Sequence, residues 1–121
     1  MGIFYEIRNK YGRFHREQLY DRVMGEILGL RGILYKDKPR IKQFSLDTGK
    51  ELSYVVFDKL VADKIVLELK AKPYSTKDDH MQCIEYLKTI PYEILYLVNF
   101  GESQFQPKRF IYTNDRKLFI K

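Results

Sequence analysis

Cysteine is nearly absent from this 121-residue sequence, and long apolar runs are missing altogether. The one cysteine, Cys83, excludes a disulfide framework and any zinc site built on several cysteines. No apolar run approaches the roughly 20 residues that span a bilayer. Residues 1–10 carry charges where a signal peptide needs its apolar stretch. There are no repeats, low-complexity tracts or linkers. We therefore expect a single domain over residues 1–121, in a soluble cytoplasmic protein.

The composition is that of a folded and basic protein. Hydrophobic residues make up 45% of the chain and charged residues 31%, so enough apolar surface is present to form a core. Lys and Arg number 22 against 16 Asp and Glu, which gives a net charge of +6. That excess favours a polyanionic partner, although net charge by itself bears mainly on solubility and non-specific association.

The first third of the chain has helical periodicity. Apolar residues at three- and four-residue spacing predict helices over residues 3–11 and 14–30. Gly12 permits a break, so two helices and one interrupted helix fit this pattern equally well. Gly32 is typical of a helix C-terminal cap.

The rest of the chain alternates strands with one helix. Strands are predicted over residues 33–45 and 51–61, on either side of a turn at 47–50, and over 65–71. Short connections make these three an antiparallel meander. A helix over 78–90 precedes a strand at 94–100, apolar enough to be covered on both sides, and an edge strand at 108–113. The order α-βββ-α-ββ predicts an α/β or α+β fold with helices around a mixed sheet.

Two charged residues interrupt the apolar third strand. Glu68 and Lys70 are two positions apart, so they share one face of the strand at roughly 6.5–7 Å. If Val61 pairs with Ile65, Asp58 lies opposite Glu68, where cross-strand Cβ atoms are roughly 4.5–5.5 Å apart. Two carboxylates so close repel unless one is protonated or a cation lies between them. A solvated pair at a strand edge is the alternative interpretation of Glu68 and Lys70.

A hard divalent cation suits this all-oxygen site and leaves positions for water and phosphate oxygens. Lys70 beside the ion could orient or deprotonate the attacking water, or hold the scissile phosphate. Together these residues predict metal-assisted phosphodiester hydrolysis.

The same residues resemble a known sequence signature. Asp58 followed by Glu68-Leu69-Lys70 resembles the D…(D/E)xK motif of the PD-(D/E)XK nuclease superfamily. Gln82-Cys83-Ile84-Glu85-Tyr86 is similar to the QxxxY motif of its RecB-like exonuclease branch. Glu17-Gln18-Leu19-Tyr20 matches the ExxY part of the small GxxExxY proteins that are placed in this superfamily. The resemblance covers roughly residues 3–111.

The resemblance implies a fold, a cofactor and a set of roles. The fold would be a central mixed sheet flanked by helices, and the cofactor Mg²⁺ or Mn²⁺. Asp58 and Glu68 would be the metal ligands and Lys70 the catalytic lysine. Glu17 would be an accessory acid, although an ion pair on its charged helix explains it equally well. Gln82 and Tyr86, four apart on one helical face, would orient water or phosphate.

Alternating cations mark the first strand. Lys36, Lys38, Arg40 and Lys42 would lie on one face, where they predict a surface that follows the phosphates of a nucleic acid. Lysines that protect a sheet edge from association are the alternative.

We expect a Mg²⁺- or Mn²⁺-dependent nuclease that acts on DNA. The alternative is a nucleic-acid-binding or accessory protein that keeps the fold without turnover, and a third is a structural protein without metal. A chain this small has little surface left for target recognition, which favours self-association or a protein partner. His15 and His80 lack metal-ligand spacing, and Cys83 is expected to be a small buried residue.

Overall fold

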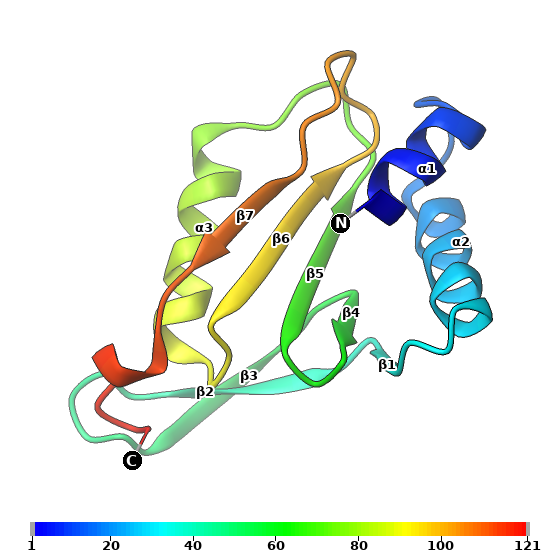
Figure 1. The fold of residues 1–121 in the computed structure, drawn as a ribbon. Coiled ribbons are helices and arrows are strands. Elements are labelled where there is room, and N and C mark those ends of the chain that lie inside the picture. Colours follow the sequence, from blue (N-terminus) through cyan, green and yellow to red (C-terminus); the bar gives the residue numbers. More distant parts are fainter. Residues whose placement is uncertain (1, 121) are drawn as a thin grey trace.

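Helices cover both faces of a five-stranded sheet in the computed structural model, which describes residues 2–120 (Figure 1). The helices are α1 (Gly2–Tyr11), α2 (Glu17–Leu30) and α3 (Lys77–Thr89), with a 3₁₀ turn at Asn114–Arg116. The strands are β1 (Tyr35–Asp37), β2 (Arg40–Phe44), β3 (Glu51–Val56), β4 (Lys59–Val61), β5 (Ile65–Lys70), β6 (Ile94–Asn99) and β7 (Lys108–Ile111). Within residues 2–120, none of the helices has the length and apolar character to cross a membrane.

The main sheet is mixed, as the sequence predicted. Its strand order is β1-β4-β5-β6-β7, and only the β5–β6 pair is parallel. A parallel pair needs a crossover connection, which α3 supplies. β6 lies inside the sheet and is largely buried, and β7 forms an edge, so the predictions for both segments are confirmed.

The sheet separates two apolar cores, one on each of its faces. On one face, α1 and α2 pack against residues that include Leu67 and Leu69 of β5. On the other face, α3 packs against Val66 of β5 and its neighbours. Since side chains alternate along a strand, Glu68 and Lys70 lie on the same face as Val66, toward α3.

Local chemistry explains where the helices begin and end. Gly12 and Gly32 have positive φ values of 77° and 67°, which glycine adopts without strain, at the ends of α1 and α2. Thr76 and Asp79 form a reciprocal capping box that starts α3. The start predicted for the second helix was wrong by three residues, because Phe14 remains 87% exposed in the connection before α2.

Both long strands of the predicted meander are interrupted. The segment predicted at 33–45 forms β1 and β2, and the segment predicted at 51–61 forms β3 and β4. Lys38 has a left-handed φ of 48°, and Pro39 has no N–H to donate, so the ladder breaks at both residues. β2 and β3 then make a separate two-stranded sheet. The prediction that Lys36, Lys38, Arg40 and Lys42 share one face of a single strand was therefore wrong.

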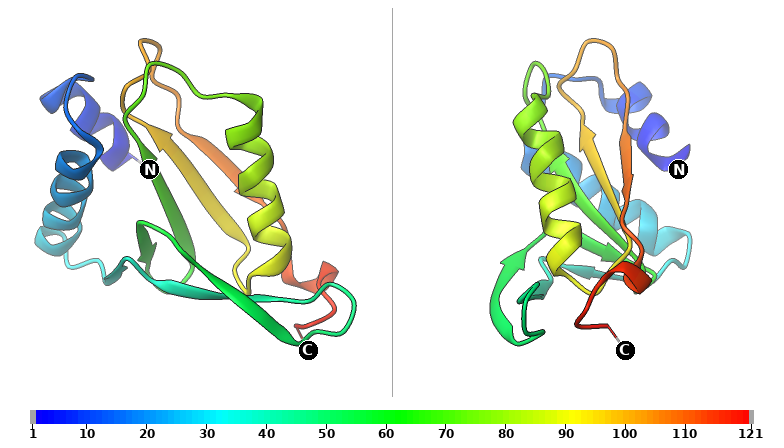
Figure 2. Two further views of the ribbon diagram at one scale, coloured as in Figure 1. Left: turned by 180° about the vertical axis from the view of Figure 1, so that it is seen from behind. Right: turned by 90° about the vertical axis from the view of Figure 1, so that its left-hand side faces the viewer.

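The β2–β3 ribbon crosses one end of the main sheet (Figure 2). Ile41 of β2 is buried against the α3 side of the molecule. At the far end of the ribbon, the ring of Phe44 stacks on Phe119, with centroids 4.8 Å apart. The C-terminal segment thus holds the far end of the β2–β3 ribbon in place. The other end of the ribbon adjoins residue 58.

Candidate active site

Asp58 lies at the break between β3 and β4, beside the middle of β5. The observed register pairs Val61 with Ile65 and Lys59 with Leu67, as predicted, and one further step brings Asp58 opposite Glu68. The Asp58 N–H donates to the Leu67 carbonyl at 3.1 Å, and Oδ2 of Asp58 accepts from the Leu69 N–H at 2.7 Å. These two hydrogen bonds, one on each side of Glu68, fix the Asp58 carboxylate.

Glu68 is the most perturbed acid in this region. Burial and, after it, the neighbouring Asp58 charge raise the pKa of Glu68 to about 7. Lys70 and a backbone hydrogen bond from Asp58 oppose that shift without cancelling it. The structure therefore brings together the two acids proposed from the sequence, and they repel each other.

Lys70 shares the face of Glu68, with Nζ 3.9 Å from Oε2 of Glu68. Both side chains are partly exposed, at 31% for Lys70 and 19% for Glu68, so the pair can meet a ligand from solvent. At this distance the pair contributes little stability, so it does not explain why a largely apolar strand carries both charges.

Helix α3 borders this pair. Burial and the Glu68 charge raise the pKa of Tyr86, whose ring packs edge-on against Phe57 at 5.2 Å. Gln82 lies one helical turn earlier, on the exposed part of α3. Cys83 is buried, and burial together with the Glu68 charge raises its pKa to about 12, which suits a packed thiol and not a nucleophile.

Helix α2 brings two more acids. Glu17 and Asp21 are one turn apart, and both line a cleft of about 380 Å³ together with Asp58 and Lys38. Partial burial and then the Asp58 charge raise the pKa of Glu17. Glu17 therefore lies within electrostatic reach of the acid pair, although Glu68 and Lys70 do not line this cleft.

Lys38 lies between Asp21 of α2 and Asp58, which directly precedes β4. Its Nζ lies 3.0 Å from Oδ1 of Asp58 and 3.1 Å from Oδ2 of Asp21. Burial lowers the pKa of Lys38, but the hydrogen bonds to Asp58 and Asp21 outweigh that effect and raise it. The amine is thus held as a cation.

Two residues of this network, Lys59 and Asp21, were given no role in the predictions from the sequence. Lys59 is 1% exposed, and its Nζ donates to Oδ1 of Asp21 at 2.8 Å and to Oδ1 of Asp37 at 2.7 Å. Asp21 thus bridges Lys59 and Lys38. The sequence held one signal for Asp21, which lies four residues after Glu17 and so on the same face of the helix.

The other predicted cations gather elsewhere. Lys36, Arg40 and Lys42 line a hollow of about 410 Å³ at the junction of β1 and β2, together with Pro91 and Tyr92. Arg40 also stacks over the ring of Tyr54 at 4.0 Å, and Lys42 pairs with Glu51 at 3.2 Å. Three of the four predicted cations therefore converge, and Lys38 is turned away from them.

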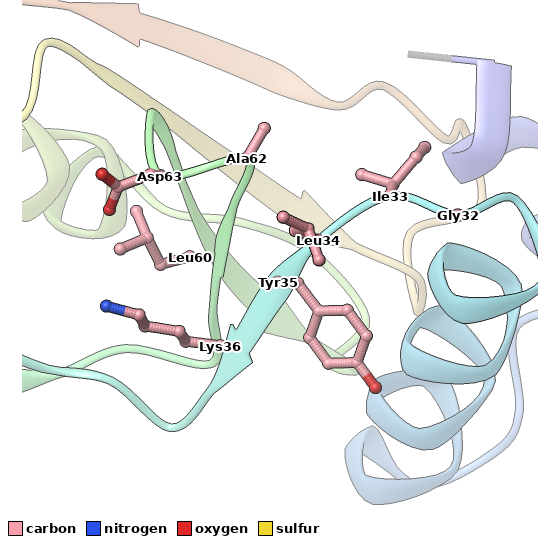
Figure 3. Close-up of a pocket in the computed structure, with 8 residues that line it drawn as sticks. All are labelled: Gly32, Ile33, Leu34, Tyr35, Lys36, Leu60, Ala62 and Asp63. Atoms are coloured by element: carbon pink, nitrogen blue, oxygen red, sulfur yellow. The ribbon is translucent and has the colours of Figure 1, made fainter.

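A wider cavity of about 730 Å³ lies beside β1 (Figure 3). Its lining is mainly apolar, and the Tyr35 ring points toward α2 while Lys36 extends the other way. Neither Asp58 nor Glu68 lines this cavity.

The donor chemistry around Asp58 and Glu68 fits a hard divalent cation. Both offer carboxylate oxygens, their mutual repulsion raises the pKa of Glu68, and Oδ1 of Asp58 already attracts a cationic amine. Among residues 2–120, no three acidic, histidine or cysteine side chains converge closely enough to enclose an ion. Mg²⁺ commonly binds through one or two carboxylates and completes its shell with water and phosphate oxygens.

Comparison with known proteins adds one match. A family model described as the PD-(D/E)XK nuclease superfamily matches residues 1–110. No curated protein and no solved structure matches the chain.

Proposed function

The chain belongs to the PD-(D/E)XK nuclease superfamily, and on that premise we propose that it is a metal-dependent nuclease that hydrolyses phosphodiester bonds in DNA. The observation that carries the proposal is the convergence of Asp58, Glu68 and Lys70. Glu68 and Lys70 lie on β5 and Asp58 directly precedes the neighbouring β4, and the charges of Asp58 and Lys70 both act on Glu68. Burying such charges in a strand costs free energy, and proteins commonly bear this cost at functional sites.

Asp58 and Glu68 would hold Mg²⁺ or Mn²⁺. When bound, such an ion polarises a phosphoryl oxygen and makes bound water a better nucleophile. The protein's own contribution is to fix the two carboxylates. Asp58 is held by the Leu69 N–H, and Glu68 projects from the central part of the sheet.

The remaining residues would act on water and phosphate. Lys70, with its amine beside Glu68, would orient or deprotonate the attacking water or neutralise the scissile phosphate. Tyr86 and Gln82 would orient the same groups from α3, and Glu17 would assist as an accessory acid from α2. The Glu68 charge acts on Tyr86 and the Asp58 charge acts on Glu17, which supports the assignment of these two residues.

Within the superfamily we place the chain with the GxxExxY proteins, and we assign Gln82 and Tyr86 to a QxxxY motif. The tyrosine of the ExxY segment, Tyr20, is buried and donates to the Gly12 carbonyl at 2.6 Å. It also accepts from the His15 N–H at 3.2 Å. Tyr20 would therefore fix the conformation of the loop that precedes Glu17.

The DNA would contact the hollow lined by Lys36, Arg40 and Lys42. Phosphate contacts of this kind release counterions, so binding should weaken steeply with salt. The hollow adjoins the ribbon that leads to Asp58, which supports its use as an approach to the site. A homo-oligomer or a protein partner that extends this surface stays a prediction.

Cleavage by matched variants tests the proposal. Labelled single- and double-stranded DNA is incubated with Mg²⁺ or Mn²⁺, with chelator as the blank. We expect Glu68→Ala and Lys70→Ala to abolish cleavage, while Lys64→Ala, in an exposed turn, retains it. Circular dichroism checks that all variants fold. If either site variant cleaves as the wild type does, its assigned role is wrong.

A catalytically inactive DNA-binding or accessory protein is the second candidate. The amine of Lys38 on Oδ1 of Asp58 favours it, because that oxygen is already paired. It predicts salt-dependent DNA binding that Lys36→Ala and Arg40→Ala weaken, with no cleavage in either metal.

A further inference from the structure

Lys38 is tied to Asp58 through both its backbone and its side chain. The Lys38 N–H donates to the Asp58 carbonyl at 3.0 Å, and its Nζ lies 3.0 Å from Oδ1 of the same residue. Lys38 also adopts a φ of 48°, a left-handed conformation that is uncommon for a lysine. This local geometry breaks the strand and delivers the amine to the carboxylate.

The second carboxylate that holds the amine is itself fixed. Oδ1 of Asp21 accepts from the buried Lys59, and Oδ2 faces Lys38. Lys59 is held in turn by Asp37 at 2.7 Å. Asp21 therefore keeps its orientation whether or not Lys38 remains on Asp58.

A divalent cation and the Lys38 amine would compete for the same oxygen. Oδ2 of Asp58 already accepts from the backbone N–H of Leu69, which makes Oδ1 the more available oxygen for a cation, and Lys38 pairs with Oδ1. Two cations on one carboxylate oxygen repel strongly in a partly buried site. Since the Lys38 side chain is 53% exposed, it has room to swing away.

We propose that Lys38 is a tethered counter-cation, which neutralises Asp58 in the metal-free protein and must release it before a divalent cation binds. The inference rests on the proposed function, because it takes Asp58 as a metal ligand. Lys38 would thus set the threshold of metal concentration at which the site becomes occupied, with Asp21 retaining the displaced amine.

The test compares Mn²⁺ binding in three proteins by titration calorimetry and by the electron paramagnetic resonance signal of free Mn²⁺. Lys38→Asn removes the amine, and asparagine tolerates the left-handed conformation better than other residues. Lys38→Gly, which tolerates it fully, serves as the second variant if Lys38→Asn is unstable. Lys64→Asn is the matched control, in an exposed turn and outside the cleft that holds Asp58.

We expect the dissociation constant for Mn²⁺ to fall about tenfold in Lys38→Asn, a change of about 1.4 kcal/mol, and to stay unchanged in Lys64→Asn. Binding by Lys38→Asn alone, with none by the wild type, supports the same conclusion. Equal or weaker binding by Lys38→Asn than by the wild type overturns the inference and leaves the nuclease proposal standing. Absence of binding to every variant overturns both.

Discussion

Oδ2 of Asp58 accepts a 2.7 Å hydrogen bond from the backbone N–H of Leu69. The carboxylate proposed to bind a metal thus also fastens the start of β4 to β5. A single substitution at Asp58 therefore affects both stability and chemistry, and the two effects can be separated by the choice of replacement.

Asp58→Ala removes the acceptor and leaves the Leu69 N–H unpaired, which should lower the free energy of unfolding by about 1–3 kcal/mol. Asp58→Asn keeps an amide oxygen at this position and should lose less than half as much. Urea denaturation measures both values. Neither variant should cleave DNA, because neither has the carboxylate charge. A stable Asp58→Ala variant would show that this hydrogen bond contributes little.

The pKa of Glu68 makes stability depend on pH. It rises from 4.5 to about 7 on folding, so between these values the folded protein binds more protons than the unfolded chain. The free energy of unfolding should therefore fall as pH rises from 4.5 to 7, by up to about 3 kcal/mol. Glu68→Gln should flatten this part of the curve.

Denaturation at pH 5 and pH 8 checks the prediction for Glu68. The matched control is Glu85→Gln, at an exposed position on α3. It should follow the wild-type curve at both pH values. If Glu68→Gln also keeps the wild-type slope, another group is responsible for the pH dependence.

Lys59 is buried between two carboxylates, and its removal should be costly. Lys59→Met leaves the buried Asp21 without its 2.8 Å partner, and we expect a loss of about 3 kcal/mol in the free energy of unfolding. Adding Asp21→Asn should recover part of that loss, because the uncompensated charge is then gone. Lys64→Met, in an exposed turn, should change stability little. Additive effects of the two substitutions would argue against this coupling.

Lys117 stabilises the connection after α3 rather than the site. Its buried Nζ donates to the carbonyls of Ile90 and Tyr92, at 2.8 and 2.7 Å, and to Oδ1 of Asn114 at 2.8 Å. Lys117→Met should lower the melting temperature and cost about 2 kcal/mol, because buried acceptors lose their donor. Differential scanning calorimetry measures the change, and Lys77→Met, on the exposed start of α3, is the comparison. DNA cleavage should persist in both variants below their melting temperatures.

Periodicity and register were enough to predict the elements that build the centre of the fold. The apolar segment 94–100 identified the buried strand β6, and counting back from a three-residue turn placed Asp58 next to Glu68. Both inferences depend on short-range geometry, in which residue spacing determines position.

The break at Lys38 could not be predicted from spacing. The left-handed conformation of Lys38 is offset by ion pairs with Asp21 and Asp58, which are distant in the sequence. The same limit explains why Lys59 was overlooked. A lysine inside an apolar strand is tolerated only when partners from α2 and β1 surround it, and that arrangement exists only in the folded chain.

The parallel pairing of β5 with β6 has a kinetic consequence. These neighbours can join only after the whole crossover through α3 has closed, which costs chain entropy before any ladder forms. The docking of the helix that carries Gln82 and Tyr86 against the strand that carries Glu68 is therefore expected in the slow step of folding. Substitutions that weaken α3 should therefore lower the folding rate more than they raise the unfolding rate.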